Sequence, residues 1–137
     1  MVKINKEERQ ELCRHAIDEY PNECCGILLG NRKSGSVQKV YRARNVVEIE
    51  RQNQHFLMNP LELYSVEKEA EKNNMEIVGF YHSHADRPAE LSREDCSFMI
   101  QGYMYMIVSV MKGICREAKC FMKVNDWSAI CEIKGKC

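Results

Sequence analysis

The stretch EIVGFYHSHADRPAELSRED, residues 76–95, combines a strand pattern with a candidate metal site. Its first seven residues are mostly apolar and predict a buried strand. Because successive side chains of an extended chain point to opposite faces, His82 and His84 share one face and Ser83 points away. Two histidines at this spacing can bind one metal ion. They can also form a buried pair that is satisfied by hydrogen bonds.

The flanking sequence alternates between helical and extended patterns. Helices are predicted over residues 5–20, with Asn5 as N-cap and Pro21 as the stop, over 60–73, and over 92–100. Strands are predicted over residues 24–30, 37–41, 55–58, 76–82 and 103–110, with weaker candidates over 118–124 and 129–134. The first two strands, joined by turn residues, indicate a β-hairpin. This mixture predicts an α/β or α+β fold, with helices flanking one central sheet.

Length and composition limit the functional classes. A chain of 137 residues suits one domain, residues 1–137. Its 20 basic residues balance 20 acidic ones, so nucleic acid is not an expected partner. The start of the chain lacks the apolar core of a signal peptide, and the longest apolar run is far shorter than the roughly 20 residues that span a bilayer. We therefore expect a cytoplasmic protein that does not enter a membrane.

The chain contains eight cysteines but no C-x-x-C pair, which disfavours a zinc ribbon or a thioredoxin-type dithiol. Without a secretory context, reduced thiols are the expectation. Cys24, Cys25 and Cys96 lie near the candidate site residues and could capture zinc or respond to oxidation. Burial as small hydrophobic residues is the favoured interpretation for these three.

Asp95 is the natural candidate for a third ligand. Two histidines and one carboxylate leave a fourth tetrahedral position open, which is typical of catalytic zinc. The competing interpretation is structural, since Ser92 and Asp95 have the spacing of a capping box at the start of a helix. The two interpretations are compatible if the cap also positions the carboxylate.

Glu23 is a candidate general acid/base, because it directly precedes a predicted strand that could lie beside the histidine strand. A metal-dependent hydrolase needs a carboxylate that takes a proton from water and later delivers it to the leaving amine. The alternative is an ordinary exposed glutamate at the end of a strand.

Together these residues resemble a known family. The order Glu23, His82-Ser83-His84, seven residues, Ser92, two residues, Asp95 resembles, without a gap or substitution, the E…H-S/T-H-x7-S-x2-D signature of JAMM metalloproteases, also called MPN-plus domains. The resemblance extends to the context P-x-E-x-C-G at residues 21–26 and to GYMYMIVSV at residues 102–110, which is similar to the short prokaryotic members. It implies a mixed sheet flanked by helices, similar to the cytidine-deaminase-like architecture.

The resemblance also implies roles for individual residues. His82, His84 and Asp95 would bind one Zn²⁺ per chain, Glu23 would be the general acid/base, and Ser92 would stabilise the oxyanion. Ser83 would have a supporting role. The expected activity is hydrolysis of a peptide or isopeptide bond after the C-terminal diglycine of a ubiquitin-like protein, with a small sulfur carrier as the favoured substrate.

Two other functions remain to be weighed. A noncatalytic MPN-type scaffold would bind a protein partner without cutting it, but such domains typically lose metal ligands, and every motif position is filled here. A zinc-dependent base deaminase would need the H-x-E and P-C-x-x-C elements, and the sequence has neither. The motif therefore favours a metallopeptidase.

Overall fold

The computed structural model describes residues 2–123 and 130–133, and these build a mixed sheet with helices on both faces. The sheet has seven strands in the order β1-β3-β2-β4-β5-β6-β7. The strands are β1 (Lys3–Ile4), β2 (Cys25–Asn31), β3 (Ser36–Ala43), β4 (Glu76–Ala85), β5 (Met104–Met111), β6 (Ile114–Lys123) and β7 (Ile130–Ile133). The helices are α1 (Lys6–Glu19), the short 3-10 turn η1 (Ile49–Arg51), α2 (Pro60–Lys72) and α3 (Arg93–Phe98).

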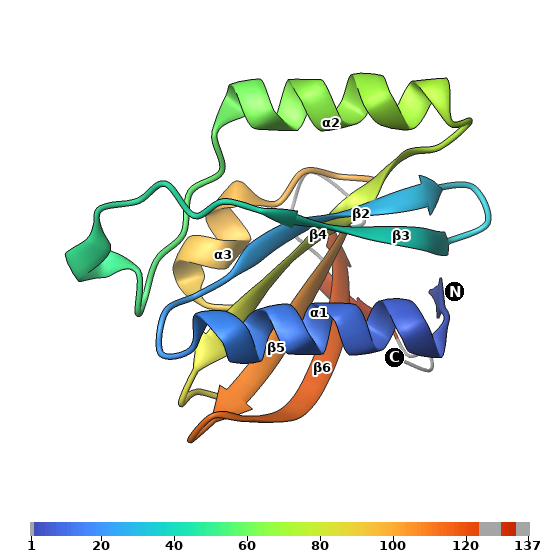
Figure 1. Ribbon diagram of the computed structural model, residues 1–137. Helices are drawn as coiled ribbons and strands as arrows, with labels where there is room; N and C mark the ends of the chain where they lie inside the picture. Colours follow the sequence, from blue (N-terminus) through green and yellow to red (C-terminus); the bar gives the residue numbers. More distant parts are fainter. Residues whose placement is uncertain (1, 124–129, 134–137) are drawn as a thin grey trace.

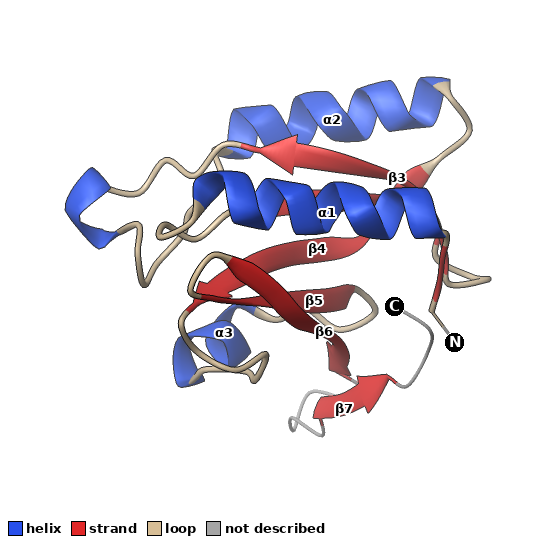
Figure 2. Ribbon diagram, turned by 60° about the horizontal axis from the view of Figure 1, so that its bottom comes forward, coloured by secondary structure: helices blue, strands red, loops and turns tan. Residues whose placement is uncertain are grey.

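Helices α1 and α2 cover opposite faces of the sheet (Figure 1). Leu12 of α1 packs in one apolar cluster with Leu28 of β2, whereas Val66 of α2 packs in another with Ile27 of the same strand. Neighbouring residues of a strand point to opposite faces, so the alternation along β2 separates the two clusters. The predicted layered α+β fold is confirmed, and Figure 2 shows the two long helices running alongside the strands.

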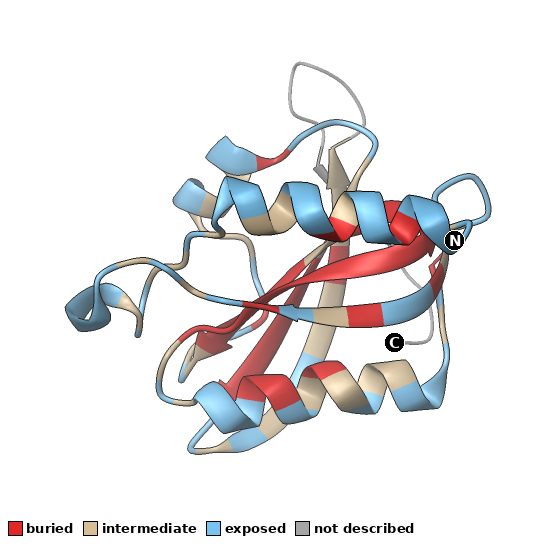
Figure 3. Ribbon diagram, turned by 45° about the horizontal axis from the view of Figure 1, so that its top comes forward, coloured by how far each residue is buried: buried red, intermediate tan, exposed pale blue. Residues whose placement is uncertain are grey.

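The most deeply buried strands are β2, β4 and β5, which Figure 3 shows in red between the helices. Strand β4 pairs antiparallel with β2 and parallel with β5. β2 pairs with β4 as far as His82 and β5 pairs with it as far as Ala85, and the two apolar clusters that include residues of α1 and α2 lie on its two faces. The C-terminal end of β4, where the motif histidines lie, is therefore a rigid part of the molecule.

Most local predictions are confirmed. Asn5 caps α1 by accepting a hydrogen bond from the Glu8 amide at 2.8 Å, and α1 ends at Glu19, before Pro21. β2 and β3 form the predicted antiparallel hairpin. α2 and β5 lie within about one residue of their predicted ranges, α3 ends at Phe98 and not at residue 100, and β4 continues past residue 82 to Ala85. β6 begins earlier than predicted, at Ile114, and β7 lies within the second weak candidate; residues 124, 129 and 134 of those two candidates lie outside the described residues.

One predicted strand is wrong, and one short strand was missed. Residues 55–58 carry an apolar pattern but form no strand, because Phe56 stacks on the ring of His82 and Met58 packs against the α2 cluster. These apolar side chains pack against other parts of the protein, and their segment does not pair with a strand. The missed strand, β1, has only two residues and pairs parallel with β3. Within the described residues, no helix is long and apolar enough to cross a membrane.

Gly79 gives the first testable prediction. A Cβ at this position would overlap the backbone carbonyl of Met104 in the adjacent strand β5. Backbone in the middle of a sheet cannot move aside, so Gly79→Ala should lower the free energy of unfolding by about 1–3 kcal/mol or more. Denaturant unfolding measures this loss. Lys39→Ala, at an exposed position of β3, is the control and should stay within about 0.5 kcal/mol of the wild type. Equal effects would contradict the close approach at Gly79.

Candidate metal centre

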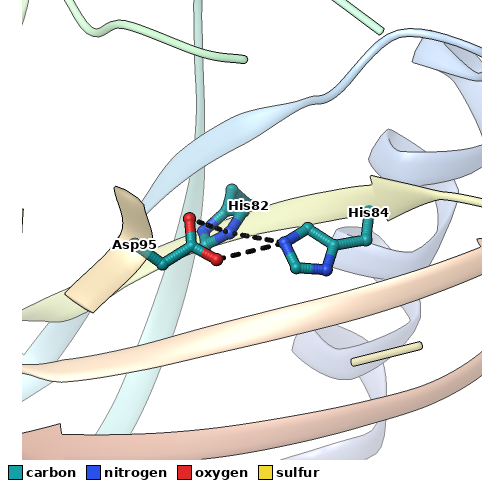
Figure 4. A group of neighbouring side chains, drawn as sticks. All are labelled: His82, His84 and Asp95. Carbon is teal, nitrogen blue, oxygen red and sulfur yellow. Dashed lines mark hydrogen bonds and ion pairs between the residues drawn. The ribbon is translucent and has the colours of Figure 1, made fainter. Parts of the chain in front are cut away.

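Three side chains converge at the C-terminal end of β4. His82 and His84 point from β4 toward Asp95 of α3, as Figure 4 shows. The Nε2 atoms of the two histidines lie 3.3 Å apart. The Asp95 carboxylate faces both rings, with Oδ1 at 3.1 Å from His82 Nε2 and Oδ2 at 3.2 Å from His84 Nε2. The three predicted ligands are therefore brought together from two separate elements.

The spacing of these donor atoms fits a small divalent cation. Metal–ligand distances of about 2.0–2.1 Å in a tetrahedral zinc site correspond to ligand–ligand distances of about 3.3 Å. The separations of 3.1–3.3 Å among the three side chains agree with this value. The donor set of two imidazoles and one carboxylate also suits zinc. The group can therefore hold a metal ion and leave one position for another ligand.

Neighbouring groups fix the orientation of each donor. His84 Nδ1 lies 3.0 Å from the carbonyl oxygen of Pro88, and a proton on Nδ1 that bonds there leaves the lone pair of Nε2 for a metal. The ring of Phe56 stacks on that of His82, with centroids 4.6 Å apart. Asp95 is held by a complete capping box: its amide donates to Ser92 Oγ at 3.0 Å, and Asp95 Oδ2 accepts from the Ser92 amide at 2.9 Å.

The Asp95 carboxylate therefore takes part in the capping box and also faces the two histidines. The helix cap aims Asp95 at the two histidines, which is the compatible arrangement that the sequence left open. Burial would raise the pKa of Asp95, but hydrogen bonds with His82 and His84 outweigh burial and hold the pKa far below its usual range. Burial also lowers the pKa of His82. Metal binding requires a carboxylate and a neutral imidazole.

Glu23 lies beside this centre on the same face of the sheet. Cys25 of β2 pairs with His82, so continuing the antiparallel register by two residues places Glu23 opposite His84. The Glu23 side chain is only 2% exposed, and Arg87 Nη2 donates to its Oε2 at 2.6 Å. Burial raises the pKa of Glu23 to about 7, although the charges of His84 and Arg87 act in the opposite direction. A carboxylate with this pKa can accept and release a proton near neutral pH.

The two motif serines have different surroundings. Ser92 Oγ accepts a hydrogen bond within the capping box, and a hydroxyl that accepts still keeps its own hydrogen to donate. Ser83 is buried on the opposite face of β4, where its Oγ accepts from the Cys24 amide at 2.8 Å and its own amide donates to the Cys24 carbonyl. Ser83 therefore ties β4 to the residue that follows Glu23.

The remaining candidates lie outside the centre. Cys24 and Cys25 are buried, and burial raises the pKa of Cys24 to about 12 and that of Cys25 further, so both stay thiols. This agrees with their interpretation as core residues; Cys96 is half-buried in α3. His15 Nδ1 lies 2.7 Å from the Tyr81 hydroxyl, and His55 Nδ1 lies 3.0 Å from Glu94.

Three groups that contact the site residues could not be predicted from the sequence. They are the side chains of Arg87 and Phe56 and the carbonyl of Pro88. Arg87 and Pro88 fall within the seven-residue spacer, where the motif specifies no residue type. Phe56 lies in residues 55–58, whose apolar pattern predicts a strand that the structure does not contain. Their roles depend on contacts between distant segments, and no local pattern signals such contacts.

Comparison with known proteins gives several relatives. Two proteins named desampylase, from Haloferax volcanii and Pyrococcus furiosus, are 30% and 32% identical to this chain. The matches cover 79% and 82% of this chain and 80% and 74% of the relatives. A solution structure of a protein from Desulfitobacterium hafniense is 30% identical with a TM-score of 0.83, covering 98% of this chain and 90% of that protein.

A more distant structure extends the likeness of fold. A JAB1/MPN domain protein from Archaeoglobus fulgidus has a TM-score of 0.56 at 18% identity, covering 88% of this chain and 89% of that protein. The sequence profile described as "Prokaryotic homologs of the JAB domain" matches residues 5–122, which include the three clustered side chains, Glu23 and Ser92. A match over this much of the chain establishes the relationship, so the chain belongs to the prokaryotic JAB/MPN family.

Proposed function

We propose that this protein is a zinc-dependent peptidase or isopeptidase that cuts the amide bond after the C-terminal diglycine of a ubiquitin-like protein. The observation that carries the proposal is the convergence of His82, His84 and Asp95 beside the buried carboxylate of Glu23. A scaffold would not require a buried acid with a pKa of about 7 next to three donor atoms.

Each residue has a task in this reaction. His82, His84 and Asp95 would hold one Zn²⁺, which supplies Lewis-acid activation of water and of the substrate carbonyl when bound. Glu23 would take a proton from the attacking water and transfer it to the leaving amine. The Ser92 hydroxyl would donate a hydrogen bond to the oxyanion that develops on the carbonyl oxygen. Ser83 supports the site by joining β2 to β4 next to Glu23.

The relatives support the substrate class. The name desampylase describes removal of a ubiquitin-like SAMP protein from its conjugates, and the two relatives with this name match about four-fifths of the present chain. We propose the same kind of partner here, a ubiquitin-fold carrier with a diglycine tail, and among such carriers a small sulfur carrier.

The test uses two substrates made from a ubiquitin-like carrier. In one, a reporter peptide continues directly from the diglycine; in the other, the diglycine is joined to a lysine side chain of the reporter. Zinc-supplied protein should release the reporter from at least one of them, and a chelator should stop the release. Binding of both substrates without any cleavage would overturn the enzymatic proposal in favour of the noncatalytic scaffold.

Ser92→Ala separates the two tasks of this serine. Loss of an oxyanion donor should lower kcat by about 10² to 10³. Loss of the helix cap should also lower the free energy of unfolding by about 1 kcal/mol. Ser92→Gly is the matched variant, because glycine at an N-cap costs only a few tenths of a kcal/mol and supplies no side-chain donor. If Ser92→Ala changes stability with no effect on rate, the serine is only a cap.

Arg87→Met tests how Glu23 is controlled. The guanidinium lowers the pKa of Glu23, so its removal should raise that pKa. Because Glu23 must be deprotonated to accept a proton, the acidic limb of kcat/KM against pH should move to higher pH. Arg93→Met, at an exposed position at the start of α3, is the control and should leave the limb in place. A shift toward lower pH would contradict the assigned contact.

A further inference from the structure

Two cysteine side chains, Cys13 and Cys115, are brought together from distant parts of the sequence. Cys13 lies in α1 and Cys115 is the second residue of β6, 102 positions later in the chain. α1 contacts β5 and β6, and Figure 1 shows the helix lying across these two strands. Both cysteines are free thiols at the border of the apolar cluster that includes Leu12, and each is only half-buried. Solvent therefore reaches the pair.

The two sulfur atoms are close enough to be joined. The Cys115 thiol donates a hydrogen bond to Cys13 Sγ across 2.8 Å. A disulfide bond has an S–S length of about 2.05 Å, so the sulfurs need to approach each other by less than about 1 Å. Thermal motion displaces atoms of a folded protein by about 0.5–1 Å. A bond between these sulfurs therefore requires no rearrangement of the sheet.

The pair also has the acidity of a redox-reactive dithiol. The hydrogen bond from Cys115 lowers the pKa of the Cys13 thiol to about 7, and the positive charge of Arg9, one turn earlier in α1, acts in the same direction against burial. The same hydrogen bond raises the pKa of Cys115. Cys13 is thus the nucleophilic thiolate, and Cys115 is the neighbouring thiol that can complete a disulfide. This arrangement is typical of oxidation-sensitive cysteines.

We propose that Cys13 and Cys115 are an oxidation site, at which a peroxide joins them in a reversible disulfide between α1 and β6. The Cys13 thiolate attacks one peroxide oxygen, the O–O bond breaks, and a sulfenic acid and water form. The Cys115 sulfur then attacks the Cys13 sulfur, the S–O bond breaks, and the departing hydroxide leaves with the Cys115 proton as a second water. Two electrons pass from the sulfurs to the peroxide oxygens. A thiol reductant restores both thiols by disulfide exchange.

The bond would fasten α1 to the hairpin that holds the segment after β4. Cys115 pairs with Val110 of β5, and the Val110 carbonyl accepts a hydrogen bond from the Asp86 amide at 2.7 Å. The Asp86 carboxylate accepts from the Lys112 amide at 2.8 Å and from the hydroxyl of Tyr20, directly after α1, at 2.7 Å. A disulfide would therefore add a covalent link where α1, the β5–β6 hairpin and the end of β4 already meet.

The thiol pair lies on the other face of the sheet from the metal centre. Cys13 and Cys115 pack against the cluster on the α1 side, whereas His82 shares its face of β4 with Phe80, which packs against the cluster on the α2 side. Oxidation of the pair therefore leaves the metal ligands in place, and its principal effect is on stability.

The first test exposes the reduced full chain to hydrogen peroxide, blocks the remaining thiols by alkylation, and analyses tryptic peptides without reduction. Trypsin cuts after lysine and arginine, so the sequence predicts the peptides QELCR at residues 10–14 and GICR at residues 113–116. Oxidised monomer should give these two peptides joined, with a mass lower than their sum by two hydrogen atoms. A thiol reductant should separate them. Absence of the joined peptides, or their presence only in a covalent dimer, would overturn the proposal.

The second test measures thermal unfolding of the oxidised and reduced forms. The oxidised wild type should unfold about 5–15 °C higher, because a disulfide that closes a long loop restricts the unfolded chain. Cys13→Ser and Cys115→Ser should show no such increase. Cys96→Ser is the matched control, because it removes a half-buried thiol of α3 and should keep both the joined peptides and the increase. Equal unfolding temperatures for oxidised and reduced wild type would contradict a link between α1 and β6.

The single variants also identify the thiol that reacts first. In Cys115→Ser, peroxide should leave a sulfenic acid on Cys13 that dimedone traps. In Cys13→Ser, trapping at Cys115 should be about 10-fold slower, because an ordinary thiol is only a few per cent thiolate at pH 7. Equal trapping in the two variants would overturn the order of attack. None of these measurements depends on zinc or on cleavage of a substrate, so this proposal stands or fails separately from the proposed function.

Discussion

His84→Ala protein is expected to lose its bound zinc while it keeps its fold. Structural zinc sites with four protein ligands have apparent binding free energies of about 10–16 kcal/mol, so one ligand contributes on the order of 3 kcal/mol. Removal of one of three ligands should therefore weaken zinc binding by about 10² to 10³. Turnover of a diglycine substrate should fall with metal occupancy. Metal analysis after dialysis, with circular dichroism as the check on folding, measures the effect.

The chain offers a matched control for this variant. His55 is a half-buried histidine whose ring pairs with Glu94, outside the group of His82, His84 and Asp95. His55→Ala should keep about one zinc per chain. Asp95→Ala should behave like His84→Ala, with an added loss of stability because the α3 capping box is also broken. Full zinc occupancy in both His84→Ala and Asp95→Ala would show that the metal binds elsewhere.

Glu23→Gln should retain zinc and lose turnover by about 10² to 10⁴, the usual contribution of a general acid/base. The amide has nearly the same shape as the carboxyl group but cannot carry the proton. Side-by-side measurement of zinc content and kcat separates this variant from the ligand variants. Loss of zinc in Glu23→Gln would mean that Glu23 is a ligand and not the proton carrier.

The same variant has a second readout in metal-free protein. Burial raises the pKa of Glu23 from 4.5 to about 7, so between these pH values the folded state binds more protons than the unfolded state. The stability of the wild type should therefore fall as pH rises through this window, by on the order of 3 kcal/mol from this group. Glu23→Gln should show a flatter profile. An unchanged slope in chemical denaturation would contradict the buried, protonated state of Glu23.

Residues 76–95 show which features of the structure can be predicted from the sequence. The apolar run predicts β4, the alternation of an extended chain places His82 and His84 on one face, and the spacing of Ser92 and Asp95 predicts a helix cap. The structure has all three features, and it shows that one carboxylate serves the cap and faces both histidines. These are local properties of the chain, which is why a sequence pattern contains them.

The features that sequence missed depend on distant contacts. The apolar pattern around Phe56 predicts a strand, but in the structure the ring of Phe56 stacks on that of His82. Arg87 gave no signal because nothing near it in the sequence indicates its pairing with Glu23, 64 residues away. Phe80 and Tyr105 lie in segments that look ordinary when taken alone, and only the pairing of β4 with β5 brings their rings to 5.7 Å from each other.

The most direct test of the central claim is the intact mass of the carrier released from a tail-extended fusion. Zinc-supplied wild-type protein should give a single carrier product whose mass ends at the second glycine, and neither the chelated protein nor His84→Ala should give this product at a comparable rate. A carrier mass that ends at any other residue, or the same yield in the presence of a chelator, would contradict a metal-dependent cut after diglycine.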